Sequence, residues 1–466
     1  MLHVPVLRAG KAYRSLNTQT LHDIRSGEPL ALVSQANSGL IARDLNQTAA
    51  YQQTLAAIPA QKLYDMSNQA ADLFLEATLP VDPIDGVMQS REEFIRCQSG
   101  TTGLPANMCA ANMEKVATAL RMTKTIIDGL SQGANQDTLN RAYRREADAL
   151  GAILPSNSPG VHALWVPTPA MRIPVMLRPG SQEPWTPMRI IQAMIAAGYP
   201  PAAFGFYPSD HAGANEILIR CDRALFFGDA RTVDAWRGTG RIQIHGPGWS
   251  KMILGPDALE NGEQHVDVLT QAIAANGGRS CVNTSAVWAP PGSRAIAEAL
   301  AKKLAGIKAT ALDDPNAQLA GFTNRRLAHL LDERIEAQLA QGGAEDLTAK
   351  YRGGPRLVEI DNTLFLQPTL IWCDHDHPLA SAEYLFPFAA FVEVEPDQMA
   401  EKLGPTLTLS LISEQESLIN AMLDSPHIDR INIGALPTNT VRWDHPHEGN
   451  LFELLYKRRA VQFAAS

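Results

Sequence analysis

The segment from Asn276 to Pro290, NGGRSCVNTSAVWAP, places a cysteine just after a pair of glycines. Gly277 and Gly278 predict a turn that can present the thiol of Cys281 to solvent. A thiolate is the most nucleophilic side chain near neutral pH, and it adds readily to carbonyl carbons. A buried structural thiol is the alternative, because free cysteine is among the most buried residue types. The segment alone leaves both interpretations open.

The composition indicates a globular protein with more than one domain. The chain has 466 residues, of which 45% are hydrophobic and 19% charged, which argues against a disordered chain. A net charge of -9 without dense Lys/Arg runs argues against nucleic acid or an anionic membrane as partner. Five scattered cysteines without a CxxC pair favour a reducing compartment. No secretory leader or apolar run of about 20 residues is recognisable, so we expect a cytoplasmic protein.

The pattern of the chain predicts elements that could position Cys281. Residues before Leu150 are expected to be mainly helical, because apolar residues recur at helical spacing. From about Leu150, short apolar runs closed by Gly, Pro or Asp alternate with helical patterns, which predicts βαβ units and a parallel sheet. Ligands bind such sheets beyond the carboxyl ends of the strands.

A second α/β block follows the first, with a boundary expected near Gly255 to Glu260. It includes a strand after Cys281, a helix with Ser293 as its N-cap, and a surface excursion at residues 341–355. The expected organisation is a mainly helical N-terminal segment with a nucleotide-binding α/β domain over residues 1–255, a catalytic α/β domain over residues 256–436, and a C-terminal tail over residues 437–466.

An ordered set of motifs between about Leu150 and Leu436 resembles the aldehyde dehydrogenase superfamily. Each motif is weak alone, but their order and approximate spacing are specific. They are LPSNSPG, VMLRPGSQEP, AAGYPPAAFGFYPSD, LFFGDA, GGRSCVNTS, FLQPTLI and AEYLFPFAAFVEV. The resemblance implies an α/β fold of two Rossmann-type parallel-sheet domains with a small oligomerisation extension. It also implies a homodimer or homotetramer.

The resemblance assigns chemistry to residues on both halves. Cys281 is implied to be the nucleophile that forms a thiohemiacetal and then a thioester, with Asn157 as the oxyanion donor. Glu383 matches the glutamate that holds the nicotinamide ribose. The thioester would then pass to water or to another thiol. The primary prediction is therefore NAD(P)-dependent oxidation of a small-molecule aldehyde.

The cofactor side departs from the family pattern. Arg178 stands at the usual lysine, and Ser181 at the glutamate that holds the ribose 2′-hydroxyl in many members. A small polar residue there tolerates a 2′-phosphate, so NADP is predicted at least as strongly as NAD. Gly228 belongs to the phosphate-contacting turn, but Asp229 follows it where a serine is usual, and its charge would oppose a pyrophosphate.

The departure with the largest chemical consequence is His245. Hydrolytic members carry a glutamate here to activate water, whereas this chain has Ile-His-Gly-Pro-Gly with no acid nearby. His245 could itself be the general base, since imidazole titrates in the useful range. Alternatively coenzyme A takes the acyl group, as in CoA-acylating members that work on acyl-CoA. HGPGWSKMIL resembles a stretch of fatty acyl-CoA reductases. A non-catalytic member of the fold is a second alternative.

Two loops carry paired histidines at i, i+2, namely CDHDHP and WDHPHE. This spacing can chelate zinc. Both loops contain proline and the family resembled here uses no metal, so no metal site is predicted. The C-terminal segment around WDHPHE also lacks the glycine-rich sequence usual in the family.

Overall fold

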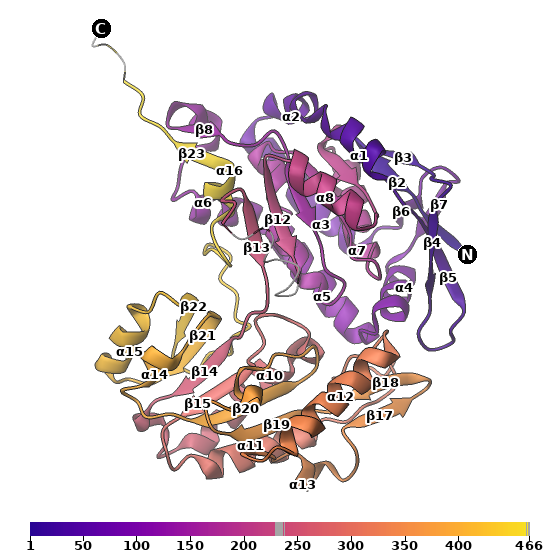
Figure 1. Cartoon of the computed structure of the whole chain (residues 1–466). Helices are drawn as coiled ribbons and strands as arrows, with labels where there is room; N and C mark the ends of the chain where they lie inside the picture. The colour runs from indigo at the N-terminus through magenta and orange to yellow at the C-terminus, as the bar shows by residue number, and fades with distance from the viewer. Residues whose placement is uncertain (229–235, 237, 463, 465–466) are drawn as a thin grey trace. The chain divides into compact units, whose positions relative to one another are not determined.

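The computed structural model describes residues 1–228, 236, 238–462 and 464 (Figure 1). The chain forms two compact units: Met1–Thr101, Cys109–Gly246 and Arg442–Ser466 make the first, and Thr102–Met108 and Pro247–Val441 make the second. The main change of unit lies between Gly246 and Pro247, before the boundary expected near Gly255. The reason is that β14 (Lys251–Leu254) is an inner strand of the second unit's sheet.

The first unit is built on a seven-stranded sheet in the order β13-β12-β9-β10-β11-β2-β3. Its five parallel strands are the apolar runs expected from Leu150 onward. The chain runs from β9 outward to β11 and then returns to β12 on the other side of β9, which makes a topological switch point at β9. The strands are β2 (Val6–Arg8), β3 (Lys11–Tyr13), β9 (Leu150–Ile153), β10 (Val175–Arg178), β11 (Phe204–Phe206), β12 (Arg223–Phe227) and β13 (Ile242–His245).

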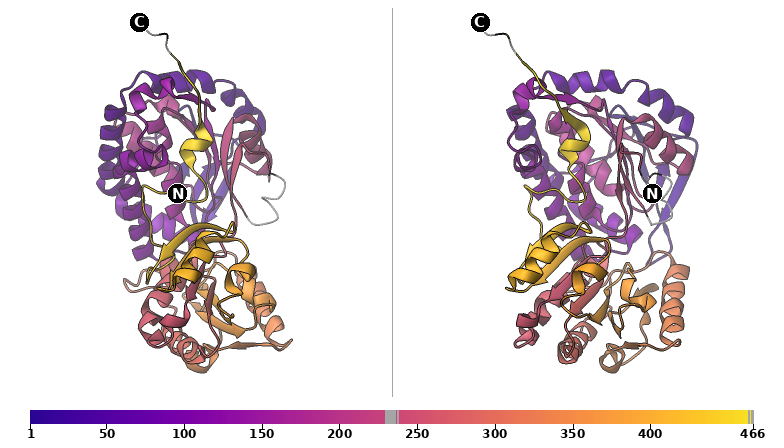
Figure 2. Two further views of the ribbon diagram at one scale, coloured as in Figure 1. Left: turned by 90° about the vertical axis from the view of Figure 1, so that its left-hand side faces the viewer. Right: turned by 60° about the vertical axis from the view of Figure 1, so that its left-hand side comes forward.

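Helices cover both faces of this sheet (Figure 2). Side chains of α1 and α8 share a core cluster with one set of strand residues, and those of α3, α5, α6 and α7 share another. Pro187 lies in the first turn of α7 and Gly198 follows the helix at φ 104°, as the sequence predicts. The helices are α1 (Ser38–Leu45), α2 (Thr48–Ala56), α3 (Ala60–Glu76), α4 (Arg91–Thr102), α5 (Ala106–Arg121), α6 (Thr123–Leu130), α7 (Trp185–Ala196), α8 (His211–Arg220) and α16 (Leu451–Leu455).

The chain begins with strands, so the expectation of a mainly helical segment before Leu150 is wrong for its first 34 residues. β1 (Leu2–Val4), β5 (Pro29–Ser34) and β4 (Thr18–His22) form a three-stranded sheet. β2 and β3 form a hairpin whose two turn residues, Ala9 and Gly10, both have positive φ. Such a turn suits the twist of paired strands. A further short pair joins β6 (Leu79–Asp82) to β7 (Val87–Gln89).

The C-terminal tail is part of the first unit. Leu451, Phe452 and Leu455 of α16 are buried in its core. β23 (Tyr456–Arg458) then pairs with β8 (Tyr143–Arg145). The expected role of the tail in contacts between subunits stays a prediction.

The second unit has its own seven-stranded sheet, in the order β16-β19-β20-β15-β14-β21-β22, in which β16 is the one antiparallel strand. α10 and α11 share a core cluster with one set of strand side chains, and α12, α14 and α15 share a cluster with the other (Figure 2). The further strands are β15 (Ala286–Ala289), β16 (Ala344–Asp346), β19 (Thr369–Cys373), β20 (Phe388–Glu393), β21 (Thr406–Ile412), β22 (Ile428–Ile433) and the hairpin of β17 (Leu357–Ile360) and β18 (Thr363–Leu366). The helices are α10 (Val266–Ala274), α11 (Arg294–Ala305), α12 (Arg325–Leu339), α13 (Ala349–Arg352), α14 (Met399–Lys402) and α15 (Glu416–Leu423).

Ser293 precedes α11 as predicted, but its hydroxyl does not cap the helix. The hydroxyl and the backbone N–H of Ser293 both donate to Oε1 of Glu393, at 3.2 and 2.9 Å. A carboxylate from the end of β20 therefore binds the start of this helix, where negative charge is favourable.

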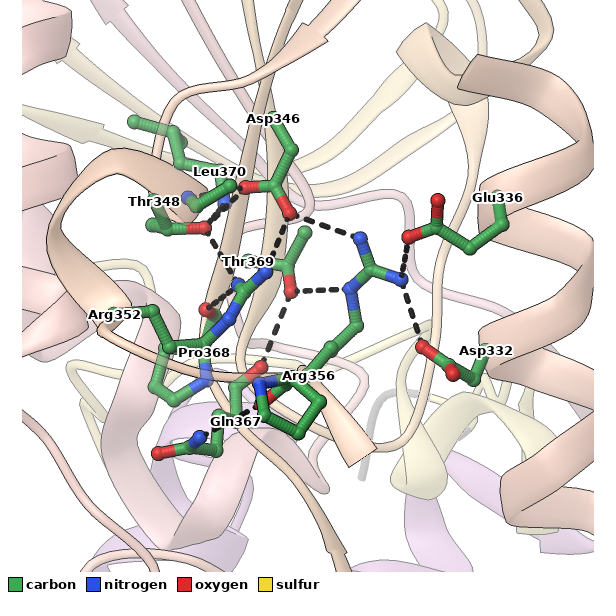
Figure 3. Close-up of polar contacts among 12 residues, drawn as sticks. Asp332, Glu336, Asp346, Thr348, Arg352, Arg356, Gln367, Pro368, Thr369 and Leu370 are labelled. Atoms are coloured by element: carbon green, nitrogen blue, oxygen red, sulfur yellow. Dashed lines mark hydrogen bonds and ion pairs between the residues drawn. The ribbon is translucent and has the colours of Figure 1, made fainter. Parts of the chain in front are cut away.

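Residues 341–355 are largely exposed, as a surface segment should be, but they are not an irregular loop. They form the edge strand β16 and the helix α13, and they carry a buried ion-pair network (Figure 3). Asp346 accepts hydrogen bonds from Arg352 and Arg356, each at 2.9 Å. Gly-rich ends made the segment look like a loop, whereas the side chains of Asp346 and Arg352 are paired and buried.

No helix within the described part of the chain has the length and apolar character needed to cross a membrane.

Candidate active site

The turn before Cys281 can be formed only by small residues. Asn276, Gly277 and Gly278 all have positive φ, at 53°, 64° and 71°. A Cβ on Gly278 would overlap the peptide between Phe386 and Pro387. The glycine pair is therefore required both by backbone conformation and by close packing.

Polar side chains hold the residues on either side of Cys281. The buried guanidinium of Arg279 donates to the carbonyl oxygens of Thr102 (2.6 Å) and Gly321. Asn283 accepts from the N–H of Ser280 at 2.8 Å and donates to two carbonyls at the end of α10. The thiol is thus carried by a turn with little freedom to move, which suits a nucleophile.

Cys281 differs from the other cysteines in its exposure. All five cysteines lie in the described residues; Cys281 is partly exposed and the other four are buried. Burial raises the pKa of the Cys97 thiol to about 11 and that of Cys373 to about 12. Because the thiolate is the reactive form, those two thiols are chemically inert near neutral pH.

A second loop, residues 247–250, lies along the backbone of Cys281. Ser250 donates from its hydroxyl to the carbonyl oxygen of Cys281 at 2.9 Å, and the N–H of Ser285 donates to the carbonyl of Ser250 at 2.8 Å. Both segments precede neighbouring parallel strands, β14 and β15. The thiol therefore lies at the amino ends of the strands in this unit, opposite to the usual rule for parallel sheets.

Lys251 holds this loop through three hydrogen bonds. Its buried ammonium donates to the carbonyls of Trp249 (2.9 Å) and Pro405 (3.2 Å) and to the hydroxyl of Thr406 (2.9 Å). Burial lowers the pKa of Lys251 to about 8, although the negative charge of Glu383 acts to raise it. No sequence pattern indicated this role.

Glu383 contacts the same loop. Its carboxylate accepts from the backbone N–H of Gly248 at 3.2 Å and of Trp249 at 2.5 Å. Trp249 has a positive φ of 44°, and its hydrogen bond to the Glu383 carboxylate helps to hold this conformation.

The predicted residues of the first unit follow the carboxyl ends of its parallel strands. Arg178 ends β10, and Asn157 lies in the half-buried turn just after β9. Gly228 follows β12, and its N–H donates to the carbonyl of His245, the last residue of β13, at 3.1 Å. Register aligns Ile153 of β9 with Arg178 on one side. Asn157, Arg178 and Gly228 thus follow β9 and its two neighbouring strands, whereas His245 ends the edge strand β13.

A small hollow beyond β10 is lined by Arg178, Ser181 and Ser209. Burial lowers the pKa of Arg178, and among the described residues this guanidinium forms no ion pair; its Nε donates to the carbonyl of Ser209 at 3.2 Å. The Ser209 hydroxyl is buried and has no hydrogen-bond partner among the described residues. Gly180 lies too close to Pro155 and Ser156 for a side chain. A cation, an unused hydroxyl and close backbone fit the phosphate-bearing end of a nicotinamide cofactor.

Asp229, the residue expected to oppose a pyrophosphate, lies outside the described residues, as does the rest of the segment 229–235. Gly228 is the last described residue of that turn.

His245 has an acidic neighbour, which corrects the expectation that none is near. Its Nδ1 contacts Oε2 of Glu448 from the C-terminal tail. Phe227 stacks on the imidazole with ring centroids 4.3 Å apart and planes 13° apart. The amide nitrogen of Gln243 lies 3.3 Å from Nε2. Sequence reasoning missed Glu448 because it is far along the chain and only the fold of the tail brings it back.

The second paired-histidine loop contributes to this cluster. Donor atoms of His245, His447 and Glu448 lie within 4.8 Å of one another. Nδ1 of His245 and Oε2 of Glu448 are already in direct contact. The absence of a metal site here stays a prediction. In the first loop, His375 instead packs edge-on against Trp288, at 5.4 Å between centroids.

These features define a class: an α/β protein with a topological switch point in the sheet of one unit and a partly exposed thiol in the other. The aldehyde dehydrogenase family model matches residues 19–404. The chain belongs to the aldehyde dehydrogenase family, a family of NAD(P)-dependent oxidoreductases, which confirms the resemblance drawn from the motifs.

Known proteins agree with this assignment. The chain is 26% identical over 314 residues to 2-hydroxymuconic semialdehyde dehydrogenase from Pseudomonas sp. (strain CF600), a match that spans only 62% of each protein. Its fold is similar to that of the aldehyde dehydrogenase KauB from Pseudomonas aeruginosa, with a TM-score of 0.81, 18% identity, and 99% and 96% of the two chains covered. The structure of indole-3-acetaldehyde dehydrogenase in complex with NAD+ also has a TM-score of 0.81. The identity is 16%, and 98% of this chain and 96% of that chain are covered. The predicted fold class is thereby confirmed.

A third solved structure, 3,6-anhydro-L-galactose dehydrogenase in complex with NAP, gives a TM-score of 0.79 at 14% identity, over 98% of this chain and 99% of that chain. One of these solved structures thus contains NAD+ and another contains NAP.

Proposed function

We propose that this protein oxidises an aldehyde with NAD(P)+ through a covalent thioester on Cys281. The observation that carries the proposal is the isolation of this thiol: it is the partly exposed member of a set whose other four members are buried. It also stands on a turn that glycines and Arg279 fix. A non-catalytic member of the fold would have no use for one accessible thiol held in this way.

The first step is addition. The Cys281 thiolate forms a C–S bond to the aldehyde carbon, and the carbonyl electron pair moves onto oxygen. The amide of Asn157 and the N–H of Cys281 are the proposed donors to that oxyanion, and one such donor contributes about 3 kcal/mol in comparable enzymes. The chemistry that a bound nicotinamide would supply at this point is acceptance of a hydride from the same carbon. The C=O bond then forms again, which leaves a thioester on Cys281.

The second step is hydrolysis. His245 takes a proton from water at Nε2 as the water oxygen adds to the thioester carbon. The C–S bond breaks, the electron pair returns to Cys281 as thiolate, and the product is a carboxylic acid. His245 is chosen as base because it ends a strand of the first unit beside Gly228 and has a carboxylate at its other nitrogen.

The cofactor is proposed to be NADP in preference to NAD. Arg178 offers a positive charge without an ion-pair partner among the described residues, and Ser181 is an exposed small residue where a carboxylate would repel a phosphate. The unused hydroxyl of Ser209 adds a donor. Glu383 is proposed to hold the nicotinamide ribose, as the resemblance to the family implies. Gly228 is proposed to let the backbone approach the pyrophosphate.

The test is the absorbance of reduced nicotinamide with a panel of aldehydes that includes semialdehydes, since the Pseudomonas relative is named for one. NAD and NADP are run separately, each with and without coenzyme A, and Cys281→Ala is the control. Turnover without coenzyme A that Cys281→Ala abolishes is the expected result. Turnover only with coenzyme A would replace the hydrolytic step by the acylating alternative. Turnover that survives in Cys281→Ala would overturn the proposal.

A further inference from the structure

A buried lysine follows the loop that lies along the backbone of Cys281. Lys251 is the first residue of β14 and is 7% exposed, which is rare for a lysine. It belongs to the same unit as Cys281 and comes directly after residues 247–250 of the loop. A charge at this position needs partners within the unit, because an unpaired buried ammonium is costly.

The ammonium of Lys251 has an acceptor for each of its three N–H groups. They are the carbonyl oxygens of Trp249 (2.9 Å) and Pro405 (3.2 Å) and the hydroxyl oxygen of Thr406 (2.9 Å). The Thr406 hydroxyl gives its own proton to the carbonyl of Gly404 at 3.1 Å, so its oxygen accepts from the lysine. A neutral amine has two N–H groups and a lone pair, and therefore cannot serve all three acceptors.

The same loop is tied to Cys281 on either side of Trp249. Ser250 donates from its hydroxyl to the carbonyl oxygen of Cys281 at 2.9 Å, and Gly248 packs against the same carbonyl. Trp249 lies between them at φ 44°, a region that bulky side chains rarely adopt, so its conformation depends on the hydrogen bonds of its peptide groups. A rearrangement of Trp249 therefore displaces both residues that contact the cysteine.

The ammonium of Lys251 loses its proton more easily than an exposed one. Burial lowers the pKa of Lys251 to about 8, although the negative charge of Glu383 acts to raise it. The residues beside it in the sheet are uncharged, namely Ala286 of β15 and Leu409 of β21. His427 approaches through its backbone carbonyl, which accepts from the N–H of Thr406 at 2.8 Å. The Cys281 thiol is the titratable group on the segment that the loop contacts. At a pH near the lowered pKa, both forms of Lys251 are present.

We propose that Lys251 is a positioning residue for Cys281: its ammonium holds Trp249, and loss of the ammonium proton releases the loop and slows acylation of the thiol. The inference rests on the proposed function, since it takes Cys281 as the nucleophile. When the proton leaves Nζ for solvent, one acceptor loses its donor and meets the amine lone pair, which repels it. A displacement of about 1 Å at a reacting group slows a reaction by up to about 100-fold, so a small movement of the loop is measurable.

The experiment uses 4-nitrophenyl acetate, an activated ester that acylates a thiolate without hydride transfer. The rate of the nitrophenolate burst reports acylation, and the signal of Cys281→Ala is subtracted. The full-length protein is followed from about pH 6 to about pH 10, across the ordinary pKa of a cysteine thiol. It is compared with Lys251→Arg, Lys251→Met and Thr406→Val.

Two controls make the same changes elsewhere in this unit. Thr408→Val lies on the same strand, β21 (Thr406–Ile412), at a buried hydroxyl that has no hydrogen-bond partner among the described residues. Lys302→Met removes an exposed lysine of α11. Both controls should match the parent at every pH.

The burst rate of the parent should rise as Cys281 ionises and then fall about 10-fold as the pH passes the lowered pKa of Lys251. Thr406→Val removes an acceptor of the charged form, so the fall should begin about one pH unit lower. A purely structural defect would not move it. Lys251→Arg keeps its charge over the whole range and should remove the fall. Lys251→Met should be slow at every pH.

The possible failures are distinguishable. No burst in the parent protein would refute the thiol chemistry of the proposed function. A burst in the parent without an alkaline fall, or with a fall that persists in Lys251→Met, would refute the positioning role of Lys251 alone. An equal loss of rate at every pH in Thr406→Val would show that its hydroxyl matters for structure and not for the charge of Lys251, and would also overturn the inference.

Discussion

Gly248 lies against the carbonyl group of Cys281 so closely that no side chain fits between them. A Cβ built on Gly248 would overlap the carbonyl oxygen of Cys281 and stand 3.2 Å from its Cβ. The N–H of Gly248 donates to Glu383, and its carbonyl accepts from Leu407 at 2.8 Å. Because the glycine is held from both sides, a substitution must displace the cysteine.

Gly248→Ala should slow acylation of Cys281 by about 10- to 100-fold, since a shift of about 1 Å in a reacting group has that effect. The nitrophenolate burst with 4-nitrophenyl acetate measures this rate. Gly246→Ala is the matched control: a Cβ on Gly246 meets no atom within 4 Å. An unchanged burst in Gly248→Ala would show that the backbone of Cys281 is not held as the packing implies.

Alkylation should single out Cys281. Burial keeps Cys97 and Cys373 protonated, with pKa values of about 11 and 12, and raises the pKa of Cys221 as well. Iodoacetamide at pH 8 should therefore modify Cys281 at least ten times faster than these thiols, with nicotinamide cofactor altering the rate. Mass spectrometry of the peptides measures this, and Cys281→Ala should take up little label. Equal labelling of several cysteines would contradict the burial pattern.

Much of the fold followed from local sequence. The apolar runs of β9 to β13 and the start and end of α7 are encoded within a few residues, so their types could be predicted from spacing. The glycine pair Gly277 and Gly278 likewise predicted, from adjacent residues alone, a turn that exposes Cys281.

What the sequence did not predict depends on contacts between distant segments. Glu448 meets His245 only because α16 and β23 fold onto the first unit, and no local pattern encodes that pairing. Residues 341–355 looked polar because their charges are visible in the sequence while the pairing of Asp346 with Arg356 is not. The N-terminal strands were missed because runs of three to six residues carry too little periodicity.

Ser181→Glu should reverse the proposed cofactor preference. A carboxylate beside Arg178 would pair with the guanidinium and repel a 2′-phosphate, while it could accept a bond from a ribose hydroxyl. The KM for NADP should rise at least about tenfold relative to that for NAD, as one lost charge interaction of about 1.4 kcal/mol gives tenfold. Steady-state kinetics with both cofactors measure the ratio. Ser181→Ala, which adds no charge, is the control and should leave the preference for NADP. An unchanged ratio in Ser181→Glu would remove Ser181 from the cofactor site.

The buried network around Asp346 gives a prediction on stability. Its carboxylate lies between the guanidinium groups of Arg352 and Arg356 (Figure 3). Burial opposes ionisation, but the charges and hydrogen bonds of these neighbours prevail and hold the pKa of Asp346 below its ordinary value of 3.8. Asp346→Asn leaves two buried cations short of a partner, and should lower the free energy of unfolding by about 3 kcal/mol.

The control for this prediction is Asp332→Asn, which removes a partly exposed partner of Arg356 while Glu336 remains bound to the same nitrogen. It should cost less than about 1 kcal/mol. The stabilisation from Asp346 is present above pH 4 and is lost as the pH falls through its lowered pKa, because the folded state then takes up the proton later than the unfolded state. The difference between the parent and Asp346→Asn, measured by denaturant titration from pH 7 to pH 3, should therefore narrow at the acidic end. A difference that is small at pH 7, or that grows toward pH 3, would show that the carboxylate does not stabilise this edge of the sheet.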